Sequence, residues 1–183
     1  MNHSGDQLVD PKLLFLKTHM QEGLHIADFG CGRTGHMVFP AAPIIGDSGM
    51  IYAVDILKDV LQNIDKRAKH LAFTNVYTVW SDVENVGKTA IPEKSLDIIF
   101  MVNILSQSSN RHAILLEAER LLKPKGRILV VDWKTEGLPF SPCKETCVDM
   151  ENIAKWGRMT GFAVQEIFDV GTYHDGIILY RND

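Results

Sequence analysis

The sequence has few cysteines, no long apolar run and no strong excess of charge of one sign. The longest apolar runs, such as residues 98–102, are far shorter than the roughly 20 residues that a membrane helix needs, so we expect no membrane insertion. The first six residues, Met-Asn-His-Ser-Gly-Asp, lack a basic flank followed by an apolar stretch, which argues against a secretory signal. Three cysteines, Cys31, Cys143 and Cys147, are too few and odd in number for a disulfide scaffold. The expected location is therefore a reducing cytoplasm.

Charge and composition exclude further classes of protein. The formal net charge of −4 argues against a general polyanion binder, so we expect no nucleic acid partner. Apolar residues make up 45% of the chain and charged residues 23%, which excludes disordered and fibrous architectures. Without repeats, low-complexity tracts or a Pro/Gly/Ser-rich linker, the 183 residues predict a single domain, 1–183. Residues 1–22 are expected to form an N-terminal helical segment, in which Leu8 to Met20 is a candidate lid. The sequence indicates no oligomeric state.

What the chain does contain is a recurring pattern of an apolar run, a turn and a longer amphipathic stretch. Seven apolar runs predict strands, and the fourth is so uniformly apolar that both of its faces should be buried. They cover residues 25–29, 50–54, 76–80, 96–102, 127–131, 162–168 and 172–180. The turn 123–126 precedes the fifth strand, and residues 169–171 join the last two strands into a terminal hairpin.

Apolar residues at spacings of three and four predict helices between these strands, over residues 56–68, 112–122 and 147–159. A further helix is expected to start at His36, with Pro40 early in it and Pro43 at a kink or an end. Strands that alternate with helices indicate an α/β fold. We predict a doubly wound, mostly parallel seven-stranded sheet with helices on both faces and an antiparallel C-terminal hairpin.

A glycine-rich turn follows the first strand. Asp28 is closely followed by Gly30-Cys31-Gly32-Arg33-Thr34-Gly35, where glycines allow a tight turn and a close approach of a ligand to the backbone. Asp55 lies 20 residues beyond Gly35 at the end of the second strand, where its carboxylate can accept two hydrogen bonds from ribose hydroxyls. Function in such a sheet lies beyond the carboxyl ends of its strands, so the turn and Asp55 predict one ligand site.

Two cofactors compete for this site. Gly30, Gly32 and Gly35 match the dinucleotide pattern G-x-G-x-x-G, which with an acid 20 residues further on would indicate a nicotinamide-dependent oxidoreductase using NAD. The negative charge of Asp28, however, suits the sulfonium or ammonium group of S-adenosylmethionine better than a pyrophosphate. Asp82, after the third strand, can accept a hydrogen bond from an adenine amino group. These acids favour S-adenosylmethionine.

Five stretches stand in a characteristic order along the chain: 26–32, 53–55, 82–83, 96–103 and 122–126. Together they resemble the motifs of the class I S-adenosylmethionine-dependent methyltransferases, and the resemblance covers nearly the whole sequence. It implies a seven-stranded sheet with an antiparallel last strand, S-adenosyl-L-methionine as cofactor and a small-molecule methyl acceptor, close to the group that includes quinone methyltransferases. The residues that it places against the cofactor are Asp28, Gly30, Cys31, Gly32, Gly35, Asp55, Ile56, Asp82, Val83 and Asn103.

The turn departs from the family pattern at one position. The third glycine of the family would fall at Thr34, and Gly35 comes one residue later. Either Arg33-Thr34 contains a one-residue insertion or the turn has the dinucleotide shape. We interpret the shift as a locally altered pocket for the methionine part of the cofactor.

The acceptor side is less well defined, and the catalytic residue is unknown. Asp132 is a candidate base or orienting group, and Trp133 is a candidate wall beside an aromatic acceptor or the sulfonium. Neither a metal site nor a catalytic role for His112 is expected. Cys143 and Cys147, four residues apart, are the kind of pair that holds a soft metalloid, so arsenite methylation is a further hypothesis. A non-catalytic module that keeps the cofactor fold is another alternative.

Overall fold

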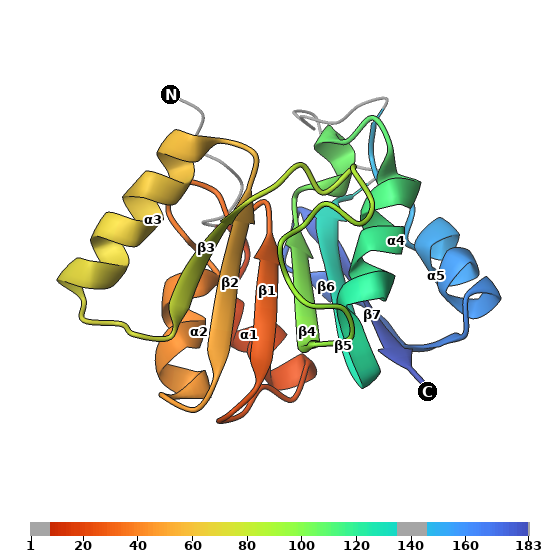
Figure 1. Cartoon of the computed structure of the whole chain (residues 1–183). Coiled ribbons are helices and arrows are strands. Elements are labelled where there is room, and N and C mark those ends of the chain that lie inside the picture. The colour runs from red at the N-terminus through yellow and green to blue at the C-terminus, as the bar shows by residue number, and fades with distance from the viewer. Residues whose placement is uncertain (1–7, 135–145, 183) are drawn as a thin grey trace.

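The computed structural model describes residues 8–134 and 146–182. A seven-stranded sheet forms its centre, with the strand order β3-β2-β1-β4-β5-β7-β6 (Figure 1). The strands are β1 His25–Phe29, β2 Met50–Asp55, β3 Val76–Trp80, β4 Leu96–Val102, β5 Leu122–Trp133, β6 Phe162–Val170 and β7 His174–Arg181. Neighbours among β1 to β5 pair in parallel, whereas β7 pairs antiparallel with both β5 and β6. The predicted doubly wound α/β fold with its antiparallel terminal hairpin is confirmed.

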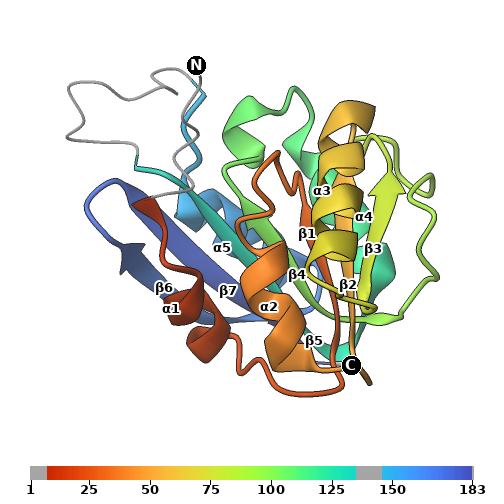
Figure 2. The same cartoon turned by 90° about the vertical axis from the view of Figure 1, so that its left-hand side faces the viewer.

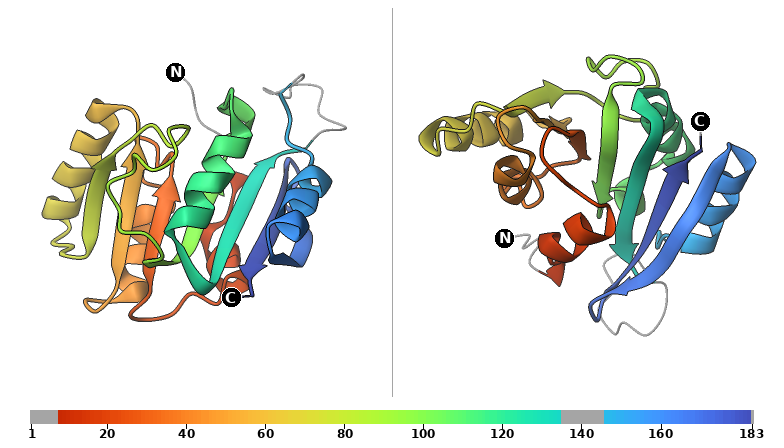
Figure 3. Two further views of the ribbon diagram at one scale, coloured as in Figure 1. Left: turned by 45° about the vertical axis from the view of Figure 1, so that its right-hand side comes forward. Right: turned by 90° about the horizontal axis from the view of Figure 1, so that it is seen from below.

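Helices cover both faces of the sheet (Figure 2). They are α1 Pro11–Lys17, α2 Val38–Ile45, α3 Lys58–His70, α4 Arg111–Leu121 and α5 Met150–Met159, with a short 3-10 helix, η2, at Leu105–Gln107. The first three helices contribute to one apolar cluster, and α4 and α5 contribute to the other. Seen from below, α1 and α5 lie on opposite sides of the sheet (Figure 3).

The central strand β4 divides these two clusters. Phe100 and Val102 belong to the first cluster, and Ile99 and Met101 belong to the second. Side chains alternate between the two faces of a strand, so a strand between two helical layers needs apolar residues at every position. This is why the sequence of β4 is an almost unbroken apolar run.

The parallel strands place the functional residues at one edge of the sheet. Because β1 to β5 run in the same direction, the loops that follow them all leave from their carboxyl ends, at the upper edge of the sheet in Figure 1. The predicted site residues after β1, β2, β3, β4 and β5 therefore gather along this edge, as ligand sites in such sheets do.

Helix α1 packs against the sheet face. Leu14 is fully buried, and the Phe15 ring meets the Phe100 ring edge-on at 5.8 Å. Lys17 pairs with Glu166 of β6 at 2.6 Å. Leu14 and Phe15 thus complete the core beside β4, and the lid role expected for this segment stays a prediction.

Three helices begin later than the sequence predicts, among them α3, which begins at Lys58 instead of residue 56. The predicted start at His36 is wrong because the glycine turn continues and α2 begins at Val38. Pro40 lies in the first turn of α2, where its missing N–H costs little, and Pro43 does not end the helix. Helix α5 begins at Met150 because Asp149 caps it by accepting a hydrogen bond from the Glu151 amide.

The boundaries of the last three strands along the chain also differ. The expected turn 123–126 is part of β5, as an irregularity of the pairing in which Leu96 is opposite Leu122 but Ile98 is opposite Arg127. The extra residues of β5 stand out of the pairing, and Lys125 among them has a φ of 64°. The terminal hairpin turns at residues 171–173 because β6 continues to Val170.

A search for membrane-spanning helices in the described parts of the chain finds none of sufficient length and apolar character.

A buried carboxylate fixes the long connection between β3 and β4. Glu117 of α4 is inaccessible to solvent and accepts hydrogen bonds from the amides of Gly87 and Thr89 at 2.6 and 3.1 Å. Arg120 pairs with it at 2.7 Å. Burial opposes ionisation of Glu117, but the hydrogen bonds from Arg120, Gly87 and Thr89 outweigh it and lower the pKa to about 2. The ionised side chain therefore holds this connection to α4.

We expect Glu117→Gln to lower the free energy of unfolding by about 3 kcal/mol at pH 7, because the folded state prefers the charged form. A lowered folded-state pKa gives stability that is present above the usual value of 4.5 and is lost as the pH falls toward about 2. Urea unfolding at several pH values should therefore show the gap between wild type and variant closing below pH 4.5. Glu93→Gln is the control, since Glu93 is 67% exposed; a gap that does not depend on pH would contradict the prediction.

Candidate functional site

The glycine turn leaves β1 and folds back onto the end of β2. The amides of Gly30 and Cys31 both donate to the carbonyl of Val54, at 2.8 and 3.1 Å. Gly30 and Gly32 have φ values of 71° and 63°, in the left-handed region that favours glycine. The turn therefore lies against β2 and does not project from the sheet.

Asp55 fastens the same turn through its side chain. One carboxylate oxygen accepts from the Gly32 amide at 3.2 Å, and the other accepts from the Leu57 amide at 2.9 Å. The half-buried carboxylate keeps acceptor capacity, because a carboxylate has about four lone-pair sites. The spacing of turn and acid in the sequence thus corresponds to a direct contact, with Asp55 still able to accept hydrogen bonds from hydroxyl groups.

Gly35 is required by the packing of two helices. Its φ is 58°, and a Cβ atom there would lie 2.7 Å from the Phe39 ring and 2.8 Å from Cδ1 of Ile64. Phe39 belongs to α2 and Ile64 to α3, so the missing side chain lets both helices approach the turn. The shifted glycine therefore has a structural role, and its contact with a cofactor stays a prediction.

Beyond Asp55, the end of β2 faces the loop after β3. Ile56 is 53% exposed and its carbonyl accepts from the Trp80 indole at 2.8 Å. Asp82 accepts from the Glu84 amide at 3.0 Å and from the side chain of Asn85 at 2.7 Å. Ile56 and Asp82 follow two neighbouring strands, and an exposed apolar side chain together with a carboxylate suits a flat heterocycle that carries a donor group.

Asn103 lies directly after β4 in a strained conformation, with a φ of 56°. Its amide donates to the Val131 carbonyl at 2.8 Å, and its carbonyl accepts from the side chain of Gln107. The side chain is 7% exposed, and its oxygen and nitrogen have no hydrogen-bond partner in the described part of the chain. A buried polar group without a partner costs about 1–3 kcal/mol, so this amide is suited to a bound ligand.

The loop after β4 also touches the glycine turn. A Cβ atom on Gly30 would lie 2.9 Å from Cδ1 of Ile104, so the glycine permits this close approach. Asp28, 3% exposed, lies in register between Ala53 of β2 and Phe100 of β4. The structure therefore brings Asp28, the turn and the Asn103 loop together at the ends of three adjacent strands.

The pKa of the Cys31 thiol is affected by the negative charge of this region. Burial raises the pKa of its thiol, and the carboxylates of Asp28 and Asp55 raise it further. The thiol is therefore protonated at neutral pH and acts as a small buried side chain. Both acids lie close enough to the turn to favour a cationic group there.

Asp132 ends β5 in a fully buried position. It accepts hydrogen bonds from the amides of Ser106 and Trp133, at 3.0 and 2.9 Å. Burial raises the pKa of Asp132 above its usual value, and these hydrogen bonds offset only part of the effect. Trp133 is half-buried and its ring lies 4.3 Å from the ring of His174. The structure thus gives Asp132 a role in holding η2, which the sequence did not reveal.

The other candidates lie elsewhere or are only partly described. His112 is exposed on α4, and the basic residues Lys66, Lys69 and His70 are exposed on α3. Cys143 lies outside the described residues, and Cys147 is disulfide-bonded. Over residues 8–134 and 146–182 no group of three or more side chains could hold a metal ion.

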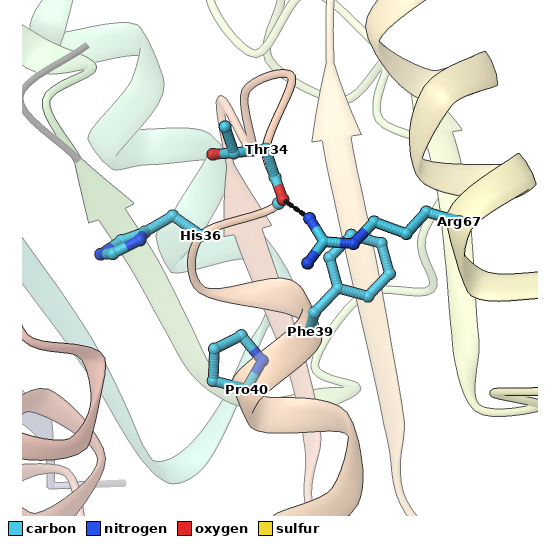
Figure 4. Close-up of a pocket in the computed structure, with 6 residues that line it drawn as sticks. Thr34, His36, Phe39, Pro40 and Arg67 are labelled. Carbon is cyan, nitrogen blue, oxygen red and sulfur yellow. Dashed lines mark hydrogen bonds between the residues drawn. The ribbon is translucent and has the colours of Figure 1, made fainter. Parts of the chain in front are cut away.

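A pocket of about 380 Å³ lies beside the glycine turn, between α2 and α3 (Figure 4). It is lined by Thr34, Gly35, His36, Phe39, Pro40 and Arg67. The Arg67 guanidinium stacks on the Phe39 ring at 4.1 Å and donates to the Thr34 carbonyl at 2.7 Å. Arg67 thereby braces the residues at which the turn departs from the family pattern.

Several features of this edge fit S-adenosylmethionine. The acids Asp28 and Asp55 suit its cationic and ribose parts, Ile56 and Asp82 suit its adenine, and Asn103 offers an unpartnered amide. The sequence analysis missed Ser106, Glu84 and Glu117, which hold the surrounding loops. Glu84 and Ser106 lie in the connections after β3 and β4, and Glu117 is a single polar residue on the otherwise apolar face of α4, so no periodic signal would have identified their partners.

Comparison with known proteins assigns a class to this fold and site. A solved structure described as a SAM dependent methyltransferase from Aquifex aeolicus superimposes with a TM-score of 0.84 at 23% identity, covering 98% of this chain and 93% of that one. Among curated proteins, an arsenite methyltransferase from Aquipseudomonas alcaligenes is 29% identical over 132 residues, which is 70% of this chain and 36% of the relative. A demethylmenaquinone methyltransferase from Geobacillus sp. is 24% identical over 116 residues, covering 63% and 48%.

The fold is that of the class I S-adenosylmethionine-dependent methyltransferases. The family model described as a methyltransferase domain matches residues 20–172, and the chain belongs to this family. The family predicted from the sequence is therefore confirmed. The chain spans only about a third of the curated arsenite methyltransferase and about half of the quinone methyltransferase.

We expect Gly35→Ala to lower the free energy of unfolding by about 2–4 kcal/mol, because the new methyl group meets Phe39 and Ile64 in a strained backbone conformation. Gly87→Ala is the matched control: its φ is 80°, and no atom lies within 4 Å of the added Cβ. Gly87→Ala should lower the free energy of unfolding by about 1 kcal/mol, through backbone strain alone. Equal losses for the two variants in urea unfolding would contradict the packing role of Gly35.

Proposed function

We propose that this chain is an S-adenosylmethionine-dependent methyltransferase that acts on a small molecule. The observation that carries the proposal is the buried, unpartnered side chain of Asn103 at the end of β4, in the loop whose Ile104 approaches Gly30 of the glycine turn. Its position, together with the family, supports this cofactor over a nicotinamide dinucleotide. When bound, the cofactor would supply an activated methyl group on a sulfonium.

The residues at the strand ends would bind and orient the cofactor. Asp55 would accept hydrogen bonds from the ribose hydroxyls while it keeps its contacts with the Gly32 and Leu57 amides. Ile56 and Val83 would pack on the adenine, and Asp82 would accept from its amino group. Asp28 would attract the cationic end of the molecule. Because methyl transfer is an in-line displacement, orientation and exclusion of water are the main contributions of the protein.

On the acceptor side, Asp132 and Trp133 have different roles in the proposal. Asp132 is engaged by the amides of Ser106 and Trp133, so it would orient the loop after β4 rather than contact the substrate. The Trp133 ring would form a wall of the acceptor site. The raised pKa of Asp132 would allow its carboxyl group to hold a proton at a higher pH than an exposed carboxyl does.

The acceptor is proposed as a small organic molecule or metalloid, since the relatives act, by their names, on arsenite and on demethylmenaquinone. We favour an organic acceptor, the class to which the quinone of the demethylmenaquinone methyltransferase belongs. A cytoplasmic location and the absence of a nucleic acid partner are part of the proposal, in keeping with the net charge of −4.

Titration calorimetry with S-adenosylmethionine tests the cofactor. We expect wild type to bind it, and Asp55→Ala to weaken binding by about 1.5–3 kcal/mol, the scale of hydrogen bonds to a charged group. Asp47→Ala, an exposed acid in the turn before β2, is the control and should bind as wild type does. NADH should give no heat. Binding of NADH, or no binding of S-adenosylmethionine, would refute the proposed cofactor.

A second experiment tests catalysis. Wild type incubated with S-adenosylmethionine and a panel of quinones, phenols, amines and arsenite should form S-adenosylhomocysteine above background with at least one organic acceptor, detected by mass spectrometry. Asp55→Ala should reduce that signal at low cofactor concentration. Binding without turnover on any acceptor would favour the non-catalytic cofactor-binding module.

A further inference from the structure

One carboxylate joins the loop after β3 to the loop after β4. Glu84 accepts hydrogen bonds from the Ser108 hydroxyl at 2.7 Å, from the Ser109 amide at 3.1 Å and from the Ser109 hydroxyl at 2.9 Å. These serines follow η2 and are separated from Glu84 by the whole of β4. Three hydrogen bonds to one ionised group form a strong link between two otherwise independent loops.

Each end of this link leads to a residue predicted to hold the cofactor. On one side, the Glu84 amide donates to the side chain of Asp82, so the two residues share one turn. On the other side, Ser108 follows Gln107, whose side chain donates to the carbonyl of Asn103. Hydrogen bonds thus link Asp82 to Glu84 and Glu84 to Ser108, and the adjacent Gln107 continues the connection to Asn103, whose side-chain amide is unpartnered in the described part of the chain.

The remainder of the β3–β4 connection is held separately. Gly87 and Thr89 are bound by Glu117 of α4, as described above. That contact lies further along the chain and fixes the connection to the helix layer. Glu84 is therefore the anchor nearest to the cofactor edge, and losing it would free residues 82–85 while leaving the Glu117 contact intact.

We propose that Glu84 is a positioning residue that sets the spacing between Asp82 and Asn103, and so pre-forms the slot for the adenosine part of the cofactor. The inference rests on the proposed function. Glu84 acts through Ser108 and Ser109 and does not itself touch the cofactor. If the two binding loops are already held at the required distance, the entropy cost of ordering them is not subtracted from the binding free energy. The affinity is therefore higher.

The test is titration calorimetry of S-adenosylmethionine into wild type and variants. Glu84→Ala removes all three hydrogen bonds and should raise Kd about tenfold. Glu84→Gln keeps an oxygen that can accept from Ser108 and from the Ser109 amide, so it should stay within about threefold of wild type. Glu166→Ala is the control, because this glutamate of β6 is ion-paired with Lys17 of α1, away from both loops.

Thermal unfolding of the ligand-free proteins separates positioning from general destabilisation. We expect Glu84→Ala to unfold close to the wild-type temperature but to be stabilised less by added S-adenosylmethionine. If this variant does not fold, Ser109→Ala, which removes only one hydroxyl hydrogen bond, replaces it and should raise Kd about threefold.

The outcomes are distinguishable. A Kd for Glu84→Ala within about twofold of wild type would overturn the inference and leave the proposed function standing. A Glu84→Gln variant as weak as Glu84→Ala would overturn it too, since charge rather than hydrogen-bonded position would then matter. Wild type that fails to bind S-adenosylmethionine would refute the proposed function, and the inference with it.

Discussion

The contact between the glycine turn and the end of β2 determines the geometry of the whole edge. The Val54 carbonyl holds the amides of Gly30 and Cys31, and the Asp55 carboxylate holds that of Gly32. Because β1 and β2 are parallel neighbours, these groups meet without any long side chain having to reach across the sheet. The folded turn then leaves room for Ile104 to pack on Gly30, which brings the loop after β4 into the same site.

Four carboxylates of this structure have different functions because their surroundings differ. Asp55 is half-buried and shares its oxygens between two amides, with acceptor capacity to spare. Asp132 is fully buried, and burial raises its pKa more than the hydrogen bonds from Ser106 and Trp133 lower it. Glu117 is equally buried, but Arg120 and two amides reverse the effect and lower its pKa. Glu84, the fourth, joins two loops. Between the two fully buried acids, the charged donor Arg120 makes the difference: it helps to lower the pKa of Glu117, whereas burial raises that of Asp132.

Much of the fold was predictable from the sequence, because the signals involved are local and repeated. The apolar run of β4 and the alternation of strands with amphipathic stretches are enough to indicate a parallel sheet between two helical layers. The boundaries were less predictable. Helix α2 begins two residues later than expected, and the turn 123–126 is absorbed into β5. In both places the pairing of distant strands or the packing of Gly35 outweighs local preference.

The sequence by itself determined the class of protein and indicated which acids stand at the carboxyl ends of the strands, because glycines, aspartates and their spacing along strands follow from the local chemistry of a turn and a strand end. It also indicated that Gly35 was out of place in the family pattern. Only the tertiary structure decided why that glycine is required, which polar residues hold the loops, and that the amide of Asn103 is buried without a partner. These properties depend on contacts between residues far apart in the chain, such as Glu84 with Ser108 and Glu117 with Gly87, and no local pattern encodes such pairs.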